Sequence, residues 1–331
     1  MKEALYWEPC PNGKAKCHLC PHGCNISPGR AGICRVRVNK AGTLYAANYA
    51  QVSSIAMDPM EKKPLYHFYP GKDILSLGTV GCNLRCSFCQ NYSISQQDAP
   101  TRELPPAQAV RLAQDQGPNC IGLAFTYSEP LMWYEYVLDT AEQAQAAGLK
   151  TVLVTNGFIQ TEPLKKLLPF INAMNIDLKA FTEDYYRELC GGKLQPVLTT
   201  VEAAVEARCH VELTTLLIPG RNDSPAEISA LSRWVAGLSP DIPLHLSRYF
   251  PQYKLNLPPT PLQTLEQALN ISREKLNYVY IGNAAVTQGR DTHCPNCGAV
   301  LIERLGFGAR LVGSTEDGRC RQCGFAGSFV L

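Results

Sequence analysis

The sequence predicts an α/β fold, a partial or full (β/α) barrel with small cysteine-rich, metal-binding modules at its N- and C-terminal ends. Two observations support this fold class. From residue 73 onward, short apolar runs alternate with longer amphipathic stretches, and separate cysteine clusters lie before and after this region. Strands that alternate with helices of this length are typical of parallel βαβ units. An open doubly wound sheet is the competing architecture, but no G-x-G-x-x-G motif follows the first expected strand.

The apolar runs predict seven strands, at 74–80, 120–125, 151–156, 171–178, 210–218, 243–249 and 277–282. Helix-like stretches lie between them, among them 130–148 and 224–238. The second of these opens with Ser224 at a cap position and Pro225 just inside. These elements assign residues 73–286 to the barrel. Residues 1–72 form an N-terminal cysteine-rich module, and residues 290–331 form a C-terminal four-cysteine module of zinc-ribbon or rubredoxin type.

The composition is that of a globular protein with a sizeable core, since 45% of the residues are hydrophobic and 18% are charged. A net charge of +2 offers no broad basic surface for nucleic acid. No apolar run approaches the length of about 18 residues that predicts a membrane span, and the N-terminus lacks the apolar core of a signal peptide. We therefore expect a cytoplasmic protein, in which clustered cysteines bind metals more often than they form disulfides.

The segment "TVGCNLRCSFCQNYSIS" holds Cys82, Cys86 and Cys89 in a C-x3-C-x2-C pattern at the end of the first expected strand. In a β/α barrel, active sites are built at the carboxyl ends of the strands. Three thiolates can bind three corners of a [4Fe–4S] cluster and leave the fourth iron open for a non-protein ligand. A zinc site with a distant fourth ligand, or buried core thiols, are the alternatives.

This segment resembles the defining loop of the radical S-adenosylmethionine (radical SAM) enzymes, including the aromatic Phe88 before the third cysteine. Further stretches narrow the resemblance to the AmmeMemoRadiSam-system radical SAM enzymes, relatives of pyruvate formate-lyase activating enzyme. They are "DPMEKKPLYHFYPG" (58–71), "CQNYSISQ" (89–96), "FTYSEP" (125–130), "VTNGF" (154–158), "DLKAFTEDYYREL" (177–189) and "YIGN" (280–283). The resemblance implies a TIM-like barrel in which SAM is the ligand of the open iron. It also implies reductive cleavage of SAM to methionine and a 5′-deoxyadenosyl radical, which abstracts hydrogen from a substrate.

The resemblance further implies two sets of site residues. The SAM-binding set is Tyr127, Ser128, Glu129, Thr155, Asn156, His245 and Asn283. The catalytic set is Asp177, Lys179 and Arg248. Relatives carry a Gly-Gly-Glu-type motif where this chain has Tyr-Ser-Glu-Pro, so only Glu129 and the proline after it match directly. Asp177 and Lys179 are two residues apart on a strand and therefore face the same way.

A structural role is the alternative for each of these residues. Glu129 could be a charge at a helix N-terminus, and Asn156 could serve a turn. His245 could be a buried, hydrogen-bonded core residue, and Asp177 with Lys179 could be an ion pair.

Two outer cysteine sets each supply four thiolates. The C-terminal set is Cys294, Cys297, Cys320 and Cys323. Its two C-x2-C knuckles predict a tetrahedral zinc site that staples a short segment, with rubredoxin-like iron as the alternative. The N-terminal set is Cys17, Cys20, Cys24 and Cys34. Zinc is the favoured metal there and an auxiliary iron–sulfur cluster is the alternative. Cys10 or His18 could replace one member. Cys120 and Cys209 are expected in the core, and Cys190 has a redox or substrate-facing role only as a minor alternative.

We expect an oxygen-sensitive radical SAM enzyme that acts on a small molecule. Memo-type partner proteins and an electron donor such as flavodoxin or ferredoxin are implied by the resemblance. The first alternative is a glycyl-radical-enzyme activase, which acts on a protein partner. Enzymes of that class often carry ferredoxin-like cysteines soon after the central triplet, whereas residues 90–119 here contain none. The second alternative is a non-catalytic, metal-stapled binding module.

Overall fold

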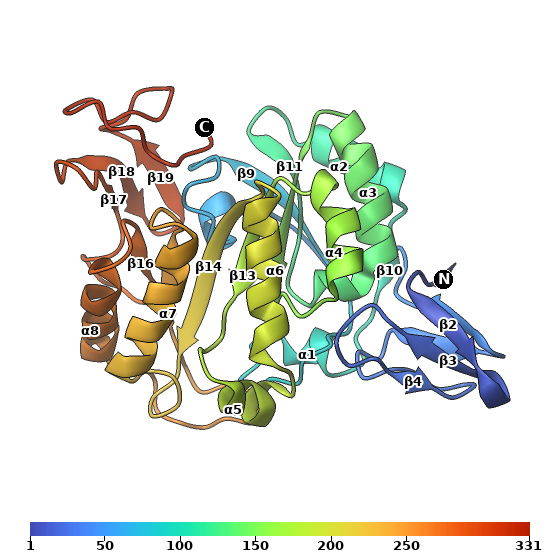
Figure 1. Cartoon of the computed structure of the whole chain (residues 1–331). Helices are drawn as coiled ribbons and strands as arrows, with labels where there is room; N and C mark the ends of the chain where they lie inside the picture. The colour runs from blue at the N-terminus through green and yellow to red at the C-terminus, as the bar shows by residue number, and fades with distance from the viewer.

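The computed structural model describes residues 1–331 and is built around an eight-stranded sheet (Figure 1). The strand order is β16-β15-β14-β13-β12-β11-β9-β8. All neighbours are parallel except β8 and β9. The two edges, β8 and β16, do not pair with each other, so the sheet is a partial barrel. The strands are β8 (Ser54–Pro59), β9 (Asp73–Gly78), β11 (Cys120–Phe125), β12 (Lys150–Thr155), β13 (Ala173–Asp177), β14 (His210–Leu217), β15 (Leu244–Arg248) and β16 (Val279–Gly282).

The α/β barrel class and the βα alternation predicted from the sequence are confirmed, and all seven expected strands are present. β8 was not predicted. It is an edge strand that pairs antiparallel with β9, and most of its residues are only partly buried. An edge strand of this kind needs no continuous apolar run, so the pattern that identified the other strands is missing. β8 belongs to the large sheet because it pairs with β9, although it precedes residue 73, where the barrel was expected to begin. The division into three modules stays a prediction.

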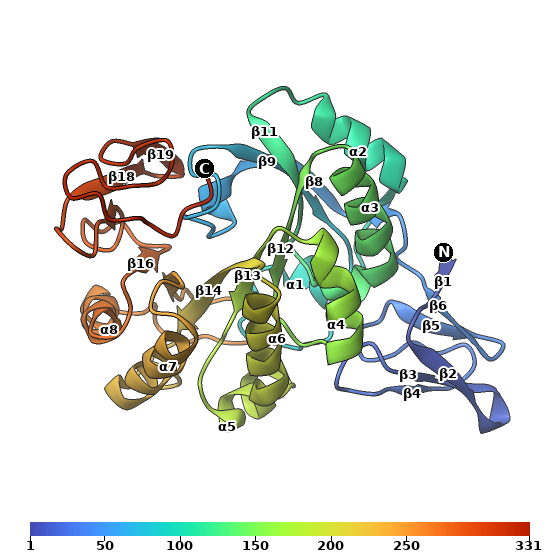
Figure 2. The same ribbon diagram turned by 45° about the horizontal axis from the view of Figure 1, so that its top comes forward.

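Helices cover the outer face of the sheet (Figures 1 and 2). They are α2 (Pro106–Gln114), α3 (Tyr134–Ala146), α4 (Thr161–Leu167), α6 (Leu194–Glu206), α7 (Pro225–Leu238) and α8 (Leu262–Arg273). The predicted cap of α7 is present, because the Ser224 side chain accepts a hydrogen bond from the Glu227 amide at 3.3 Å. A short 3-10 helix, η3 (Pro130–Trp133), leads into α3. No helix combines the length and the apolar character needed to cross a bilayer.

Two small modules pack against opposite ends of the parallel strands (Figure 1). The N-terminal module has two three-stranded sheets and contacts the carboxyl ends, where the Gln160 amide donates to the Leu19 carbonyl at 3.1 Å. The C-terminal module contacts the amino ends, where Phe68 and Val330 form a β-bridge. The N-terminal strands are β1 (Lys2–Glu3), β5 (Arg37–Lys40), β6 (Thr43–Ala46), β2 (Trp7–Cys10), β3 (Lys14–Cys17) and β4 (Asn25–Ile26). The C-terminal strands are β17 (Thr292–His293), β18 (Val300–Leu305) and β19 (Gly308–Leu311).

One hydrophobic cluster of 68 buried residues runs from the N-terminal module through the barrel. The C-terminal module has a separate small core made of Cys294, Leu301, Ile302 and Cys320. A core of four residues cannot stabilise a segment of this length alone. The C-terminal module therefore depends on its packing against the barrel and on its cysteines.

Candidate functional site

The central cysteine loop follows β9 at the carboxyl edge of the sheet. Two backbone hydrogen bonds hold it, from the Arg85 amide to the Cys190 carbonyl at 2.7 Å and from the Ser87 amide to the Leu189 carbonyl at 2.9 Å. These partners end η5 (Tyr186–Cys190), a π-helical turn after β13. The loop is thus braced by a segment that lies about a hundred residues further along the chain.

Neighbouring polar groups contact the sulfurs of Cys82 and Cys89. The Cys82 sulfur lies 3.4 Å from the Leu84 amide and 3.6 Å from Nδ2 of Asn156. The Cys89 sulfur lies 3.2 Å from the Ser95 hydroxyl. Burial raises the pKa of Cys82 well above its usual value, so a bare thiolate is disfavoured there. Donors aimed at a buried sulfur suit a thiolate whose charge is balanced by a metal.

Glu129, Thr155 and Asn156 come together beside this loop. The Glu129 carboxylate accepts three hydrogen bonds: from the Leu131 amide at 3.0 Å, the Thr155 hydroxyl at 2.6 Å and the Asn156 amide at 2.9 Å. Burial raises the pKa of Glu129 to about 7, although these hydrogen bonds oppose the rise. The carboxylate therefore ties the end of β12 to the loop after β11. Three of the predicted SAM-binding residues share one network next to Cys82.

Tyr127 and Ser128 precede Glu129 and differ in their contacts. Tyr127 adopts a positive φ of 68°, and its hydroxyl donates to the Asp58 carboxylate, which also binds Lys63 at 2.6 Å. The backbone carbonyl of Tyr127 accepts from Asn91 at 2.8 Å. The Ser128 hydroxyl is buried and has no hydrogen-bond partner. Tyr127 is thus held in place by its neighbours, whereas the Ser128 hydroxyl is not.

Asp177 and Lys179 form the ion pair that their spacing allows, with 2.9 Å between Nζ and the carboxylate. The Asp177 side chain is 37% exposed and that of Lys179 is 14% exposed, so this pair opens toward solvent at the barrel mouth. Cys190 lies against Cys86, and its hydrogen bond lowers the pKa of the Cys86 thiol. The Lys179 ammonium also lies 6.0 Å from the ring centre of Phe88. A fourth thiol and a cation therefore border the triplet.

His245 is buried inside the barrel, and its Nε2–H group donates to the Glu212 carboxylate at 2.7 Å. Glu212 also pairs with His210 at 3.0 Å and accepts from the backbone amides of Tyr66 and His67. Burial opposes the charge of Glu212, but the hydrogen bonds from its two histidines lower its pKa well below the usual value. This network links β14 and β15 to the chain segment between β8 and β9. The predicted SAM contact of His245 stays a prediction.

Arg248 and Asn283 meet at the ends of β15 and β16. Nδ2 of Asn283 donates to the Arg248 carbonyl at 2.8 Å, and Nε of Arg248 donates to the Thr260 carbonyl at 2.8 Å. The Arg248 guanidinium also lies 4.9 Å from the ring centre of Phe250. None of these contacts reaches the cysteine loop, so the two residues form a separate group at this edge, and their roles stay predictions.

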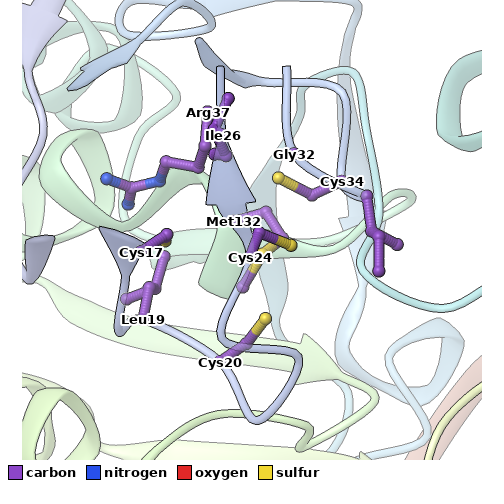
Figure 3. A pocket seen from close by; sticks show the side chains of 10 residues that line it. Cys17, Leu19, Cys20, Cys24, Ile26, Gly32, Cys34, Arg37 and Met132 are labelled. Atoms are coloured by element: carbon purple, nitrogen blue, oxygen red, sulfur yellow. The ribbon is translucent and has the colours of Figure 1, made fainter. Parts of the chain in front are cut away.

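The two outer cysteine sets differ in geometry. The four C-terminal sulfurs all lie within 4.8 Å of one another, with Cys294–Cys323 and Cys297–Cys320 separations of 3.6 Å. The four N-terminal cysteines line a pocket in the N-terminal module (Figure 3). Cys120 is buried in the core as expected, and Cys209 is only partly buried.

Sequence reasoning missed several residues that build the site. Asn83 accepts from Asn156 at 3.0 Å and donates to the Phe158 carbonyl at 2.6 Å, which joins the cysteine loop to the end of β12. The sequence offered one indication of this role, because Asn83 lies inside the cysteine motif, directly after Cys82. Cys190 was given only a minor role because nothing in the sequence brings it to Cys86. Asp58 and Lys63 lie in a stretch that carried the family resemblance, but no local pattern connects them to Tyr127.

Comparisons with known proteins agree with this site. Residues 76–231 match the family model described as the radical SAM superfamily. An uncharacterized protein of Methanocaldococcus jannaschii is 44% identical over 338 residues, and the match covers 100% of both chains. The pyruvate formate-lyase-activating enzyme of Listeria monocytogenes is 20% identical over 167 residues, covering 48% of this chain and 67% of that protein.

Among solved structures, Streptococcus suis SuiB bound to S-adenosylmethionine superposes with a TM-score of 0.52 at 15% identity. The match covers 68% of this chain and 53% of that chain. This likeness concerns the fold alone. The family model and the activating-enzyme relatives indicate an enzyme. The match to the family model begins in β9, the strand that leads into the cysteine loop. The chain therefore belongs to the radical SAM superfamily.

Proposed function

We propose that this protein is a radical SAM enzyme of the AmmeMemoRadiSam type that abstracts hydrogen from a small-molecule substrate. The observation that carries the proposal is the meeting of the cysteine triplet with the Glu129 network at the carboxyl edge of the sheet. The residues present fit a [4Fe–4S] cluster, because three cysteines share one loop and two N–H groups donate to the sulfur of Cys82. When bound, such a cluster supplies the electron that cleaves SAM and produces the 5′-deoxyadenosyl radical.

Glu129 is suited to bind the ammonium group of SAM. A carboxylate has about four acceptor positions, and three of them are used by neighbouring donors. Two of these donors share Oε1 and only the Asn156 amide reaches Oε2, so Oε2 keeps one position free. Ser128, the residue before Glu129, has a buried hydroxyl without a hydrogen-bond partner. In this proposal Thr155 and Asn156 orient the carboxylate and do not need to touch SAM.

Asp177 and Lys179 are proposed to lie on the substrate side of the site. They are the charged pair at the mouth of the barrel, and Lys179 borders the cysteine loop through Phe88. A cation and a carboxylate at this place can orient a polar substrate beside the reacting carbon of SAM. The buried wall behind them excludes water from the radical.

The C-terminal cysteines are proposed to hold a structural zinc ion. Thiolates at about 2.3 Å from one zinc stand about 3.8 Å apart, close to the 3.6 Å separations found in this set. The module packs at the amino ends of the strands, away from the cysteine triplet, which supports a stapling role. Rubredoxin-like iron has the same geometry and is the alternative.

An activase that acts on a glycine in a protein partner is the second candidate function. The relatives named as activating enzymes favour it, since the match to the Listeria protein spans 67% of that enzyme. The absence of cysteines in residues 90–119 favours the small-molecule reading. A flavodoxin or ferredoxin as electron donor and a Memo-type partner remain part of the proposal for either function.

The test is anaerobic reconstitution of the full chain with iron, sulfide and SAM. We expect the electron paramagnetic resonance (EPR) signal of the reduced cluster to change when SAM is added, and 5′-deoxyadenosine to form with a reductant. Deuterium transfer from candidate small molecules into 5′-deoxyadenosine then identifies the substrate. If the signal does not respond to SAM and no 5′-deoxyadenosine forms, the chain is a non-catalytic metal-stapled module.

A further inference from the structure

The four N-terminal cysteines line one pocket of the N-terminal module (Figure 3). Cys17 ends β3, Cys24 directly precedes β4, and Cys20 lies in the loop between these strands. Cys34 reaches the pocket from the turn before β5. The rest of the lining is apolar apart from one arginine and comprises Leu19, Ile26, Gly32, Ile33 and Met132.

The spacing of the sulfurs distinguishes this set from the C-terminal one. Sulfurs around one zinc stand about 3.8 Å apart, and the C-terminal set is closed to this degree. No three sulfurs of the N-terminal set lie within 4.8 Å of one another, and the same is true of the central triplet. In a [4Fe–4S] cluster each thiolate binds a different iron, so its sulfurs stand farther apart than those around a single ion. The N-terminal set has the open spacing of the triplet and a full complement of four ligands.

A buried arginine offers the pocket an unused donor. Arg37 lines the pocket and lies beside Cys17 in Figure 3. Its two terminal nitrogens bind the Glu135 carboxylate at 2.7 and 2.9 Å, and both side chains are at most 1% exposed. The Nε of Arg37 is buried and has no hydrogen-bond partner. An unpaired buried N–H destabilises the fold, and a bond to an anionic thiolate or cluster sulfide would offset this cost.

The pocket also adjoins the central cysteine loop. A Cβ placed on Gly81, the residue before Cys82, would lie 2.6 Å from the Cys34 carbonyl oxygen. On the other side, Nε2 of His22 lies 2.7 Å from the Asn83 carbonyl. The chain segments that carry the two cysteine sets are therefore in direct contact.

We propose that Cys17, Cys20, Cys24 and Cys34 bind a second [4Fe–4S] cluster in electronic contact with the one expected at the central triplet. This assignment replaces the zinc that the sequence favoured for the set. A reduced one-electron carrier, a flavin or iron–sulfur protein, would be oxidised as the N-terminal cluster gains one electron, which then passes to the central cluster. No bond or proton changes in this transfer. The transfer rests on the proposed function, whereas the binding of the cluster does not.

Acid-labile sulfide in the anaerobically reconstituted full chain tests the binding. Two [4Fe–4S] clusters give about eight sulfides per chain and one gives about four. Zinc or rubredoxin-like iron at the C-terminal set adds no sulfide, so the count is independent of that site. A wild-type count of about four, with zinc at two sites, would overturn the proposal.

Variants then locate the second cluster. The variant with all three central cysteines changed to Ser should keep about four sulfides and the EPR signal of a reduced [4Fe–4S] cluster. The Cys20→Ser/Cys24→Ser variant should lose about four sulfides and keep the SAM-responsive signal, which separates this proposal from the proposed function. Cys10→Ser, which changes a cysteine outside the pocket, should match the wild type. Retention of all sulfide in the Cys20→Ser/Cys24→Ser variant would contradict the assignment.

Electronic contact is tested on the reduced wild type. Two neighbouring paramagnetic clusters broaden each other's EPR lines, so the wild-type spectrum should differ from the sum of the spectra of the two variants. An additive spectrum would refute the contact and leave two independent clusters.

Discussion

The Glu129→Gln substitution separates a SAM-binding carboxylate from one that only braces the fold. In the wild type, Oε1 accepts from the Leu131 amide and the Thr155 hydroxyl, and Oε2 accepts from the Asn156 amide. Glutamine has the same shape but only one oxygen. Whichever way the side-chain amide is turned, its NH2 group faces one of the two backbone N–H groups, which loses its acceptor.

The structure sets two magnitudes for this change. Leaving one buried backbone N–H unpaired costs about 1–3 kcal/mol of folding free energy. A hydrogen bond between the SAM ammonium and a carboxylate is worth about 1.5–3 kcal/mol, so its loss weakens SAM binding roughly 10- to 150-fold. The first effect follows from the contacts present, and the second occurs only if Oε2 binds SAM.

Glu135→Gln is the matched control. Glu135 is a second buried glutamate, in α3, and it accepts from Arg37 and from the Leu5 amide. Its loss of charge leaves a buried guanidinium uncompensated and costs about 3–5 kcal/mol of stability. We expect this variant to unfold at lower urea concentration and to bind SAM with wild-type affinity.

The assay is a SAM titration of the reduced, anaerobically reconstituted proteins, followed by EPR, alongside urea unfolding of the same samples. Glu129→Gln should lose both stability and SAM affinity, and Glu135→Gln only stability. If Glu129→Gln loses stability but binds SAM within about twofold of the wild type, Glu129 is a structural carboxylate and the assignment of Oε2 is wrong.

Three further predictions concern the rest of the molecule. Cys294→Ala should release the C-terminal metal, measured by metal analysis, and expose the C-terminal module to limited proteolysis. The formation of 5′-deoxyadenosine at low temperature should persist in this variant. An unchanged metal content would contradict the four-thiolate site. Glu212→Gln should destabilise the barrel by about 3 kcal/mol in urea unfolding, because its two histidines lose their shared carboxylate. The pKa of Glu212 is lower in the folded protein than in the unfolded chain, where it is about 4.3. The stability that the Glu212 carboxylate adds is therefore present above about pH 4.3 and is lost as the pH falls toward the pKa of the folded protein. The difference in unfolding free energy between the wild type and Glu212→Gln should accordingly shrink in acid. Gly81→Ala should destabilise the chain more than Gly148→Ala: both glycines have positive φ, but only at Gly81 does the added Cβ meet a backbone oxygen, that of Cys34, whereas Gly148 faces open space. Equal losses in the two glycine variants would mean that the contact between the N-terminal module and the cysteine loop is not tight.

The sequence by itself determined the barrel class, the seven parallel strands and the three places along the chain where cysteines cluster. These features are local, because an apolar run or a C-x2-C spacing is complete within a few residues. The Asp177–Lys179 ion pair was among the alternatives that the sequence offered, but the shared strand face expected for it is wrong, because β13 ends at Asp177 and Lys179 lies in the loop that follows. The motifs that resemble the radical SAM superfamily are likewise contiguous in the sequence, so the superfamily could be identified without the tertiary structure.

Only the tertiary structure decided which of these pieces touch. It joined Glu129 to Thr155 and Asn156 beside Cys82, and it brought Cys190 against Cys86. It also placed the N-terminal module at the carboxyl ends of the parallel strands and the C-terminal module at the amino ends (Figure 1). The distance between two sulfurs depends on how strands far apart in the chain pack together. For that reason a list of four cysteines could not distinguish a zinc ion from a cluster, whereas the spacing of their sulfurs favours zinc at one end of the barrel and a cluster at the other.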